Sequence, residues 1–111
     1  MFVQSVALAS LVCVLVGASA AAGQAGDQSQ AGRAYADAAC ASCHAVGRSG
    51  ASPLKAAPPF REIMTRYPAE DLEEALAEGI VVGHPAMPNF QLEGPDLENL
   101  VAYLRTLQPQ R

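Results

Sequence analysis

The sequence contains no tryptophan and few other aromatic residues, with three phenylalanines and three tyrosines among 111 residues. Half of the residues are hydrophobic, but many of these are alanines, which bury little surface when a chain folds. A small chain that is short of large apolar side chains often needs a disulfide, a metal or a cofactor to stabilise its core. The composition therefore favours one small domain built around a bound group.

Basic residues are also scarce, and the formal net charge is −4. Residues 31–67 contain five bases and two acids, whereas residues 68–99 contain eight acids and no base. No basic cluster is present that would bind nucleic acid, and no stripe suits a lipid surface. The acidic stretch is either the solvated face of a helix or one pole of a molecule that is steered toward a charged partner.

The N-terminal stretch differs from the rest of the chain. Residues 2–17 are uncharged and rich in Val, Leu and Ala, which is short for a membrane span of about 20 residues. The small residues at 18–20 suit cleavage by signal peptidase, although no basic residue precedes the apolar run. We expect a signal peptide at 1–20, cleaved near Ala20, and a flexible linker at 21–28. The alternative is an uncleaved anchor, and only then would the protein associate with a membrane.

Residues 29–108 predict one all-α domain, because apolar residues recur at helical spacing and no alternating strand pattern occurs. In the last helix, which starts at Pro95, apolar residues recur at i, i+3, i+4 and i+7 from Leu97. Prolines and glycines divide the domain into short helices and long loops. Helices are expected over 29–39, 60–66 and 68–79 and from Pro95, and loops over 45–59 and 82–94.

The motif that carries chemistry is Cys40-Ala41-Ser42-Cys43-His44. Side chains three residues apart share one face of a helical turn, so the Cys40 and Cys43 sulfurs can form thioethers with the two vinyl groups of one haem. The His44 imidazole can then reach the iron from the same face. A C-x-x-C-H string is the haem attachment signature, and we expect one covalent haem c.

Other uses of these residues are possible but fit less well. A structural zinc site needs four ligands, and His44 adjoins Cys43 too closely to form an ordinary second pair with His84. A thioredoxin-like dithiol needs a βαβ context that the chain lacks. A plain disulfide between the two cysteines is compatible with export but gives His44 no role.

The second axial ligand of the iron has four candidates: Met87, His84, Met64 and an open site. Met87 is favoured, because Pro85 and Pro88 restrict the backbone on either side of it. Met64 lies in a short apolar helix, where core packing is the simpler interpretation. A His44/Met87 pair would raise the reduction potential and close the iron to other ligands, which favours electron transfer over catalysis.

A proline-rich turn, Ala57-Pro58-Pro59-Phe60, follows the motif. An imidazole bound to a metal usually donates its second N–H to an acceptor such as a carbonyl, and this turn is placed to present one, with Phe60 covering the ring. Two adjacent prolines are also common in loops of no special function. The residues alone leave both interpretations open.

Taken together, residues 31–107 resemble the small class I cytochrome c family, in its short bacterial monohaem form. The resemblance implies a fold of helices and loops wrapped around one haem. It also implies the roles of individual positions: thioether attachment at Cys40 and Cys43, proximal ligation by His44, a carbonyl acceptor at Pro58 beside Phe60, and distal ligation by Met87.

The resemblance further implies how the first and last helices cross. Gly32 stands where the family has a glycine at this crossing, with Leu100 and Tyr103 packing from the last helix. One position departs from the family: an aromatic residue usually stands where Ala36 is, and Tyr35 precedes it. The departure predicts a smaller contact at the crossing, or a Tyr35 that covers the haem edge differently.

The function implied is single-electron transfer in the bacterial periplasm by a carrier that is not itself an enzyme. Its partners would be redox proteins: a periplasmic dehydrogenase, an oxidase or a membrane electron-transfer complex. We expect docking around residues 45–49 and the Met87 loop, with Arg48 and Lys55 as charges at the rim. One alternative is a dedicated cytochrome subunit of a dehydrogenase or oxidase. Another is an open-site peroxidase or gas sensor, which would require Met87 to dissociate.

Overall fold

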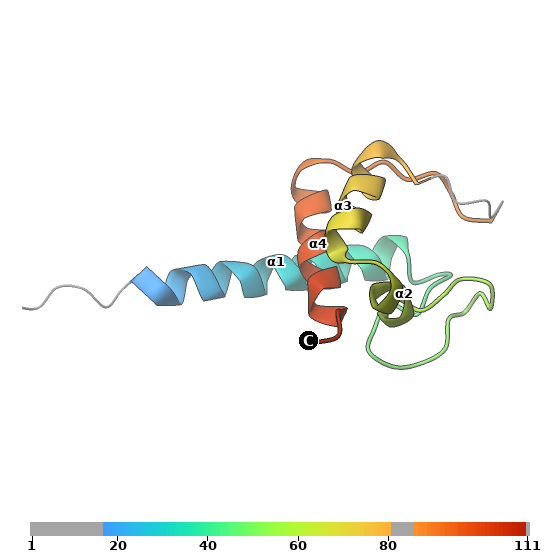
Figure 1. The fold of residues 1–111 in the computed structure, drawn as a ribbon, viewed down its shortest axis with the longest axis horizontal. Coiled ribbons are helices and arrows are strands. Elements are labelled where there is room, and N and C mark those ends of the chain that lie inside the picture. The colour runs from blue at the N-terminus through green and yellow to red at the C-terminus, as the bar shows by residue number, and fades with distance from the viewer. Residues whose placement is uncertain (1–16, 81–85, 111) are drawn as a thin grey trace, which may run out of the picture.

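A computed structural model describes residues 17–80 and 86–110 of the chain (Figure 1). These residues form four α-helices joined by irregular loops, and no strand occurs within the two described ranges. The predicted all-α class is therefore confirmed. In chain order the helices are α1 (Gly17–Ala39), α2 (Phe60–Arg66), α3 (Ala69–Glu78) and α4 (Gly94–Leu107).

The three shorter helices lie where the apolar spacing predicted them, and prolines and glycines set their ends. Pro59 and Pro68 immediately precede α2 and α3, where their fixed backbone angle suits a helix start. Gly79 ends α3 with a φ of 102°, a conformation that glycine adopts without strain. Pro95 lies in the first turn of α4 and needs no hydrogen-bond partner there.

The core is built mainly on α4, which crosses α1 and contacts all three other helices (Figure 1). The α4 side chains that face the core recur at the helical spacing seen in the sequence. Phe60 and Met64 from α2 and Leu76 from α3 are buried against them. The buried residues of α4 are Leu100, Val101, Tyr103, Leu104 and Leu107.

The crossing of α1 and α4 is a close backbone contact at Gly32. A Cβ atom at this position would lie 1.8 Å from the Asn99 carbonyl oxygen and 2.8 Å from the Tyr103 Cβ. One turn further along α1, Ala36 is completely buried. Ala36 belongs to the core, and Tyr35 is half-buried beside a cavity described below. The expectation that Tyr35 covers the haem edge stays a prediction.

The N-terminal part of α1 differs from the expected flexible linker at 21–28. Helix α1 begins at Gly17, so the whole of this segment is helical. The segment has no proline and several alanines, and alanine is the best helix former. A Cβ at Gly23 or Gly26 would meet nothing within 4 Å, and this half of α1 points away from α2 and α3 (Figure 1). Residues 23–28 are mostly exposed, so this stretch is held mainly by the backbone hydrogen bonds of the helix.

Two of the sequence predictions fall largely on other parts of the chain. Most of the predicted signal peptide at 1–20, and His84, lie outside the described residues. The boundaries of the predicted domain at 29–108 stay a prediction. None of the helices described here combines the length and the apolar character that crossing a membrane requires.

The contact at Gly32 predicts a large effect for a single methyl group. We expect Gly32→Ala to lower the free energy of unfolding by about 1–3 kcal/mol or more, because a rigid backbone carbonyl blocks the new Cβ. Gly26→Ala is the matched control in the same helix, and it should be neutral or slightly stabilising. Thermal unfolding of the two variants tests this, and equal midpoints would contradict the close crossing.

Candidate functional site

A cavity of about 1030 Å³ lies within the domain, and all four helices contribute to its lining. Its walls are mostly apolar, with Leu72 and Leu76 from α3 and Leu100 and Leu104 from α4. Small-molecule sites in proteins span roughly 300–1000 Å³, so this cavity is large for a domain of this size. The shortage of bulky side chains in the sequence has its counterpart here, since the core is arranged around this space.

The Cys40–His44 motif forms part of the cavity wall, in the turn that follows α1. Backbone hydrogen bonds shape this turn: the amides of Cys43 and His44 both donate to the Cys40 carbonyl, at 3.2 and 2.9 Å. The two cysteines and the histidine all line the cavity and are half-buried. Burial raises the pKa of the Cys40 thiol. Two thiols and an imidazole therefore share one wall of an apolar cavity.

The His44 ring is held in one orientation. Its Nδ1 atom lies 2.7 Å from the Pro58 carbonyl oxygen, and because a carbonyl can only accept, Nδ1 donates. Nε2 is then the ring nitrogen with a free lone pair, as a metal ligand requires. The Phe60 ring lies against the imidazole, with centroids 5.4 Å apart at 52°. The Phe60 amide also donates to the Ala45 carbonyl at 2.9 Å, which ties the turn to the motif.

The two methionines that the sequence offered as ligands lie in different places. Met87 lines the cavity and is half-buried, next to Pro88. Met64 is 3% exposed, belongs to the core and does not line the cavity. The structure thus brings Met87 to the same cavity as His44, and it separates Met64 from it. The other candidate, His84, lies outside the described residues.

Several cavity residues were not singled out in the sequence. Leu54 and Tyr67, 37% and 52% exposed, are large apolar side chains that line the cavity and also reach the surface. Arg66 and Asp71 add one charge of each sign to the lining. The spacing of Leu72 and other α3 residues indicated a buried helix face. No pattern in the sequence tells a face that packs on protein from a face that packs on a bound group.

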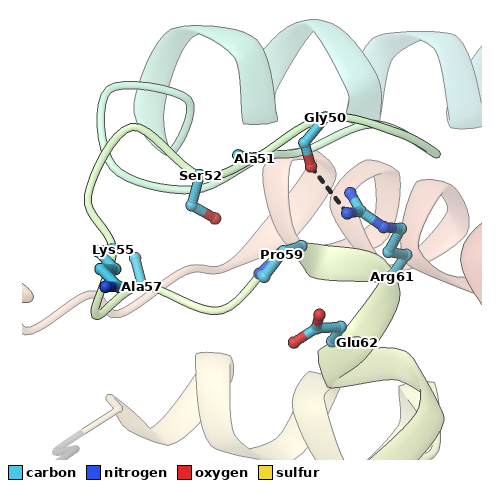
Figure 2. A pocket seen from close by; sticks show the side chains of 8 residues that line it. All are labelled: Gly50, Ala51, Ser52, Lys55, Ala57, Pro59, Arg61 and Glu62. Atoms are coloured by element: carbon cyan, nitrogen blue, oxygen red, sulfur yellow. Dashed lines mark hydrogen bonds between the residues drawn. The ribbon is translucent and has the colours of Figure 1, made fainter.

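A second hollow of about 470 Å³ lies beside the loop at residues 50–59 and contains no cysteine, histidine or methionine (Figure 2). Arg61 of α2 reaches across it and donates from Nη2 to the Gly50 carbonyl at 2.7 Å. Lys55 and Glu62, which also line it, are exposed. The hydrogen bond of Arg61 joins α2 to the loop at this hollow.

Comparison with known proteins shows the family of this chain. The family model for cytochrome c matches residues 29–108. The chain belongs to the cytochrome c family. A cytochrome c-552 from Bradyrhizobium diazoefficiens is 33% identical over 70 residues, which cover 63% of this chain and 65% of the relative. The match thus spans just under two thirds of that relative's length. No solved structure matches the chain.

Family membership confirms the predicted cofactor, a covalently bound haem c, over the zinc and disulfide alternatives. The described residues fit this group. The cavity is large and apolar, as the haem macrocycle requires, and Cys40 and Cys43 stand on its wall at the spacing of a haem attachment motif. The haem supplies one-electron redox chemistry at its iron.

The size of the cavity predicts that the chain depends on its haem to fold. Leaving so large an apolar space without its bound group is costly for a small domain, whose whole stability is only about 5–15 kcal/mol. We expect the chain made without haem attachment to lose most of its helical circular dichroism at 25 °C. A haem-free chain with the helical content and cooperative unfolding of the holoprotein would contradict this.

Proposed function

We propose that this cytochrome is an exported one-electron carrier, whose iron is ligated by His44 and Met87 and whose haem is attached through Cys40 and Cys43. The observation that carries the proposal is the joint placement of these four side chains on one apolar cavity. Residues 44 and 87 are far apart in the sequence, and the fold brings both to the same cavity.

On the proximal side, the contact between His44 and Pro58 supports ligation. A hydrogen bond from the second ring nitrogen to a carbonyl fixes the orientation of a ligating imidazole and raises its basicity. Here that bond is 2.7 Å long, and Phe60 restricts the ring from the side. The imidazole therefore needs no reorientation when the charge of the iron changes.

On the distal side, Met87 is the candidate that the structure supports. A thioether ligand raises the reduction potential of a histidine-ligated haem, and two protein ligands close the iron to other molecules. Such a site favours electron transfer over catalysis. The open-site peroxidase or sensor would need Met87 to leave the iron.

The surface beside the cavity favours docking of another protein. Leu54 and Tyr67 expose apolar area there. A basic residue adjoins each of them in the sequence, Lys55 after Leu54 and Arg66 before Tyr67. Arg48, which we expected at the rim, is exposed and donates to the Thr106 carbonyl at 2.8 Å, which ties its loop to the end of α4. The docking surface we propose is therefore centred on Leu54 and Tyr67, and its partner is a redox protein.

The periplasm is the proposed location, and it rests on the apolar segment at 2–17 followed by small residues. The partner would be a dehydrogenase, an oxidase or a membrane electron-transfer complex. A dedicated subunit of one such complex would use the same site. Co-purification with a stoichiometric larger protein at high salt would identify the subunit, and its absence would favour the free carrier.

Absorption spectroscopy tests the closed, six-coordinate iron directly. We expect the reduced protein to show a low-spin c-type spectrum, and the oxidised protein to show the weak near-infrared band of methionine coordination. Carbon monoxide should leave the reduced spectrum nearly unchanged at neutral pH, because Met87 occupies the second axial position. Rapid and complete carbon monoxide binding would instead support the open-site alternative.

Separate substitutions of the two methionines distinguish an iron ligand from a core residue. Met87→Ala should keep the covalent haem, lower the reduction potential and allow carbon monoxide to bind, because the thioether is lost. Met64→Leu is the control, since Met64 is buried away from the cavity, and it should keep both the potential and the spectrum. An unchanged potential in Met87→Ala would show that another group ligates the iron.

Cysteine variants test the attachment of the haem and the cleavage of the signal peptide. Cys40→Ser should reduce the yield of holoprotein and leave at most one thioether, which the intact mass of the protein reports. Cys13→Ser, within the predicted signal peptide, should leave the mass and the haem content of the mature protein unchanged. A mature protein whose mass includes residue 13 would overturn cleavage near Ala20.

A further inference from the structure

The hydroxyl of Tyr103 links α4 to the chain that leaves the haem motif. Tyr103 is 6% exposed, and its hydroxyl donates to the carbonyl oxygen of Val46, which is also 6% exposed. Val46 lies two residues after His44. A buried carbonyl is normally paired, because leaving it without a partner is costly. Helix α4 therefore supplies the hydrogen-bond donor for the Val46 carbonyl, close to His44 in the chain.

Arg33 of α1 orients this hydroxyl. Its Nη1 donates to the Tyr103 Oη at 3.2 Å, and its guanidinium carbon lies 5.6 Å from the centre of the Tyr103 ring. The Nε atom of Arg33 is 3.2 Å from both carboxylate oxygens of Asp37, which fixes the guanidinium. Because Tyr103 accepts from Arg33, its own proton is free to point at Val46. Hydrogen bonds arranged in series in this way polarise one another.

Two further hydrogen bonds hold Ala45, the residue between His44 and Val46. The Ala45 carbonyl accepts from the Phe60 amide at 2.9 Å, and the Ala45 amide donates to Ser52 Oγ at 3.0 Å. The turn that contains Phe60 is the one whose Pro58 carbonyl accepts from His44. Val46 is thus connected, through its neighbour Ala45, to the turn that holds the acceptor of the His44 ring.

We propose that Tyr103, oriented by Arg33, is a positioning residue for the His44 imidazole and thereby adjusts the reduction potential. This inference rests on the proposed function, in which His44 ligates the iron. Unlike His44, Tyr103 is not among the residues that line the cavity. Its action is indirect: it holds the backbone that keeps the Pro58 carbonyl in line with Nδ1.

The direction of the effect follows from the hydrogen bond to Pro58. A strong bond at Nδ1 makes the imidazole a better electron donor and stabilises the ferric iron. Without the Tyr103 hydroxyl, Val46 loses its partner, the turn loosens and the bond weakens. The ferric state then loses stabilisation, and the reduction potential rises.

The test is Tyr103→Phe in the holoprotein, with two measurements. The reduction potential should shift upward, and the His44 Nδ1 proton of the reduced protein should exchange with solvent faster by on the order of tenfold, the effect of losing one buried hydrogen bond. Thr106→Val is the matched control. It also removes a hydroxyl from α4, but that hydroxyl donates to the Tyr103 backbone carbonyl within the helix, so both quantities should stay at their original values.

A purely structural role would give a different result. If His44 exchange accelerates only as much as the slowest backbone amides of α1, or if the potential does not move, the positioning role is overturned. Should Tyr103→Phe not mature, Arg33→Gln carries the test, with a smaller shift in the same direction. No shift there would also overturn the role.

The same spectra separate this inference from the proposed function. If the parent protein shows no His44 Nδ1 proton displaced by the haem ring current, His44 is not the ligand, and the proposed function fails. If that proton is displaced but does not respond to Tyr103→Phe, the proximal ligand stands and only the positioning role fails.

Discussion

The close approach of α1 and α4 at Gly32 is the contact on which the rest of the structure depends. It fixes how α1 lies against α4, and the Cys40–His44 turn follows directly after the end of α1. It also fixes α4, which supplies Leu100 and Leu104 to the cavity. A side chain at position 32 would separate the two helices and with them two walls of the haem site. Packing and chemistry are therefore set by one backbone contact.

His44 shows how a short chain holds an imidazole in one orientation. The loop between His44 and Phe60 has no regular structure, yet both of its ends are joined, by the His44 bond to Pro58 and by the Phe60 bond to Ala45. Prolines limit the backbone freedom of the turn before folding begins. Further order comes from outside the loop, through the Tyr103 hydroxyl of α4 on Val46 and the Arg61 guanidinium of α2 on Gly50.

Much of this arrangement could be predicted from the sequence, because it depends on local patterns. The haem motif is recognised from the spacing of its cysteines and histidine. The apolar residues that recur at helical spacing from Leu97 predicted α4 directly. Other features depend on contacts between distant residues. The bond from Tyr103 to Val46 joins residues 57 apart, and the exposure of Tyr67 follows from the shape of the cavity. The helical state of residues 21–28 did not follow from the sequence pattern, because small polar residues resemble a linker although alanine favours a helix.

The outer half of α1 has a geometric consequence for anything attached to it. From residue 21, where the chain would begin after the proposed cleavage, to residue 31 the helix rises about 15 Å, at roughly 1.5 Å per residue, and it leads away from the helices α2 and α3 that line the cavity (Figure 1). A group joined at residue 21 would therefore sit at the far end of this helical stretch, away from α2 and α3. A redox partner could approach Leu54 and Tyr67 without meeting that attachment.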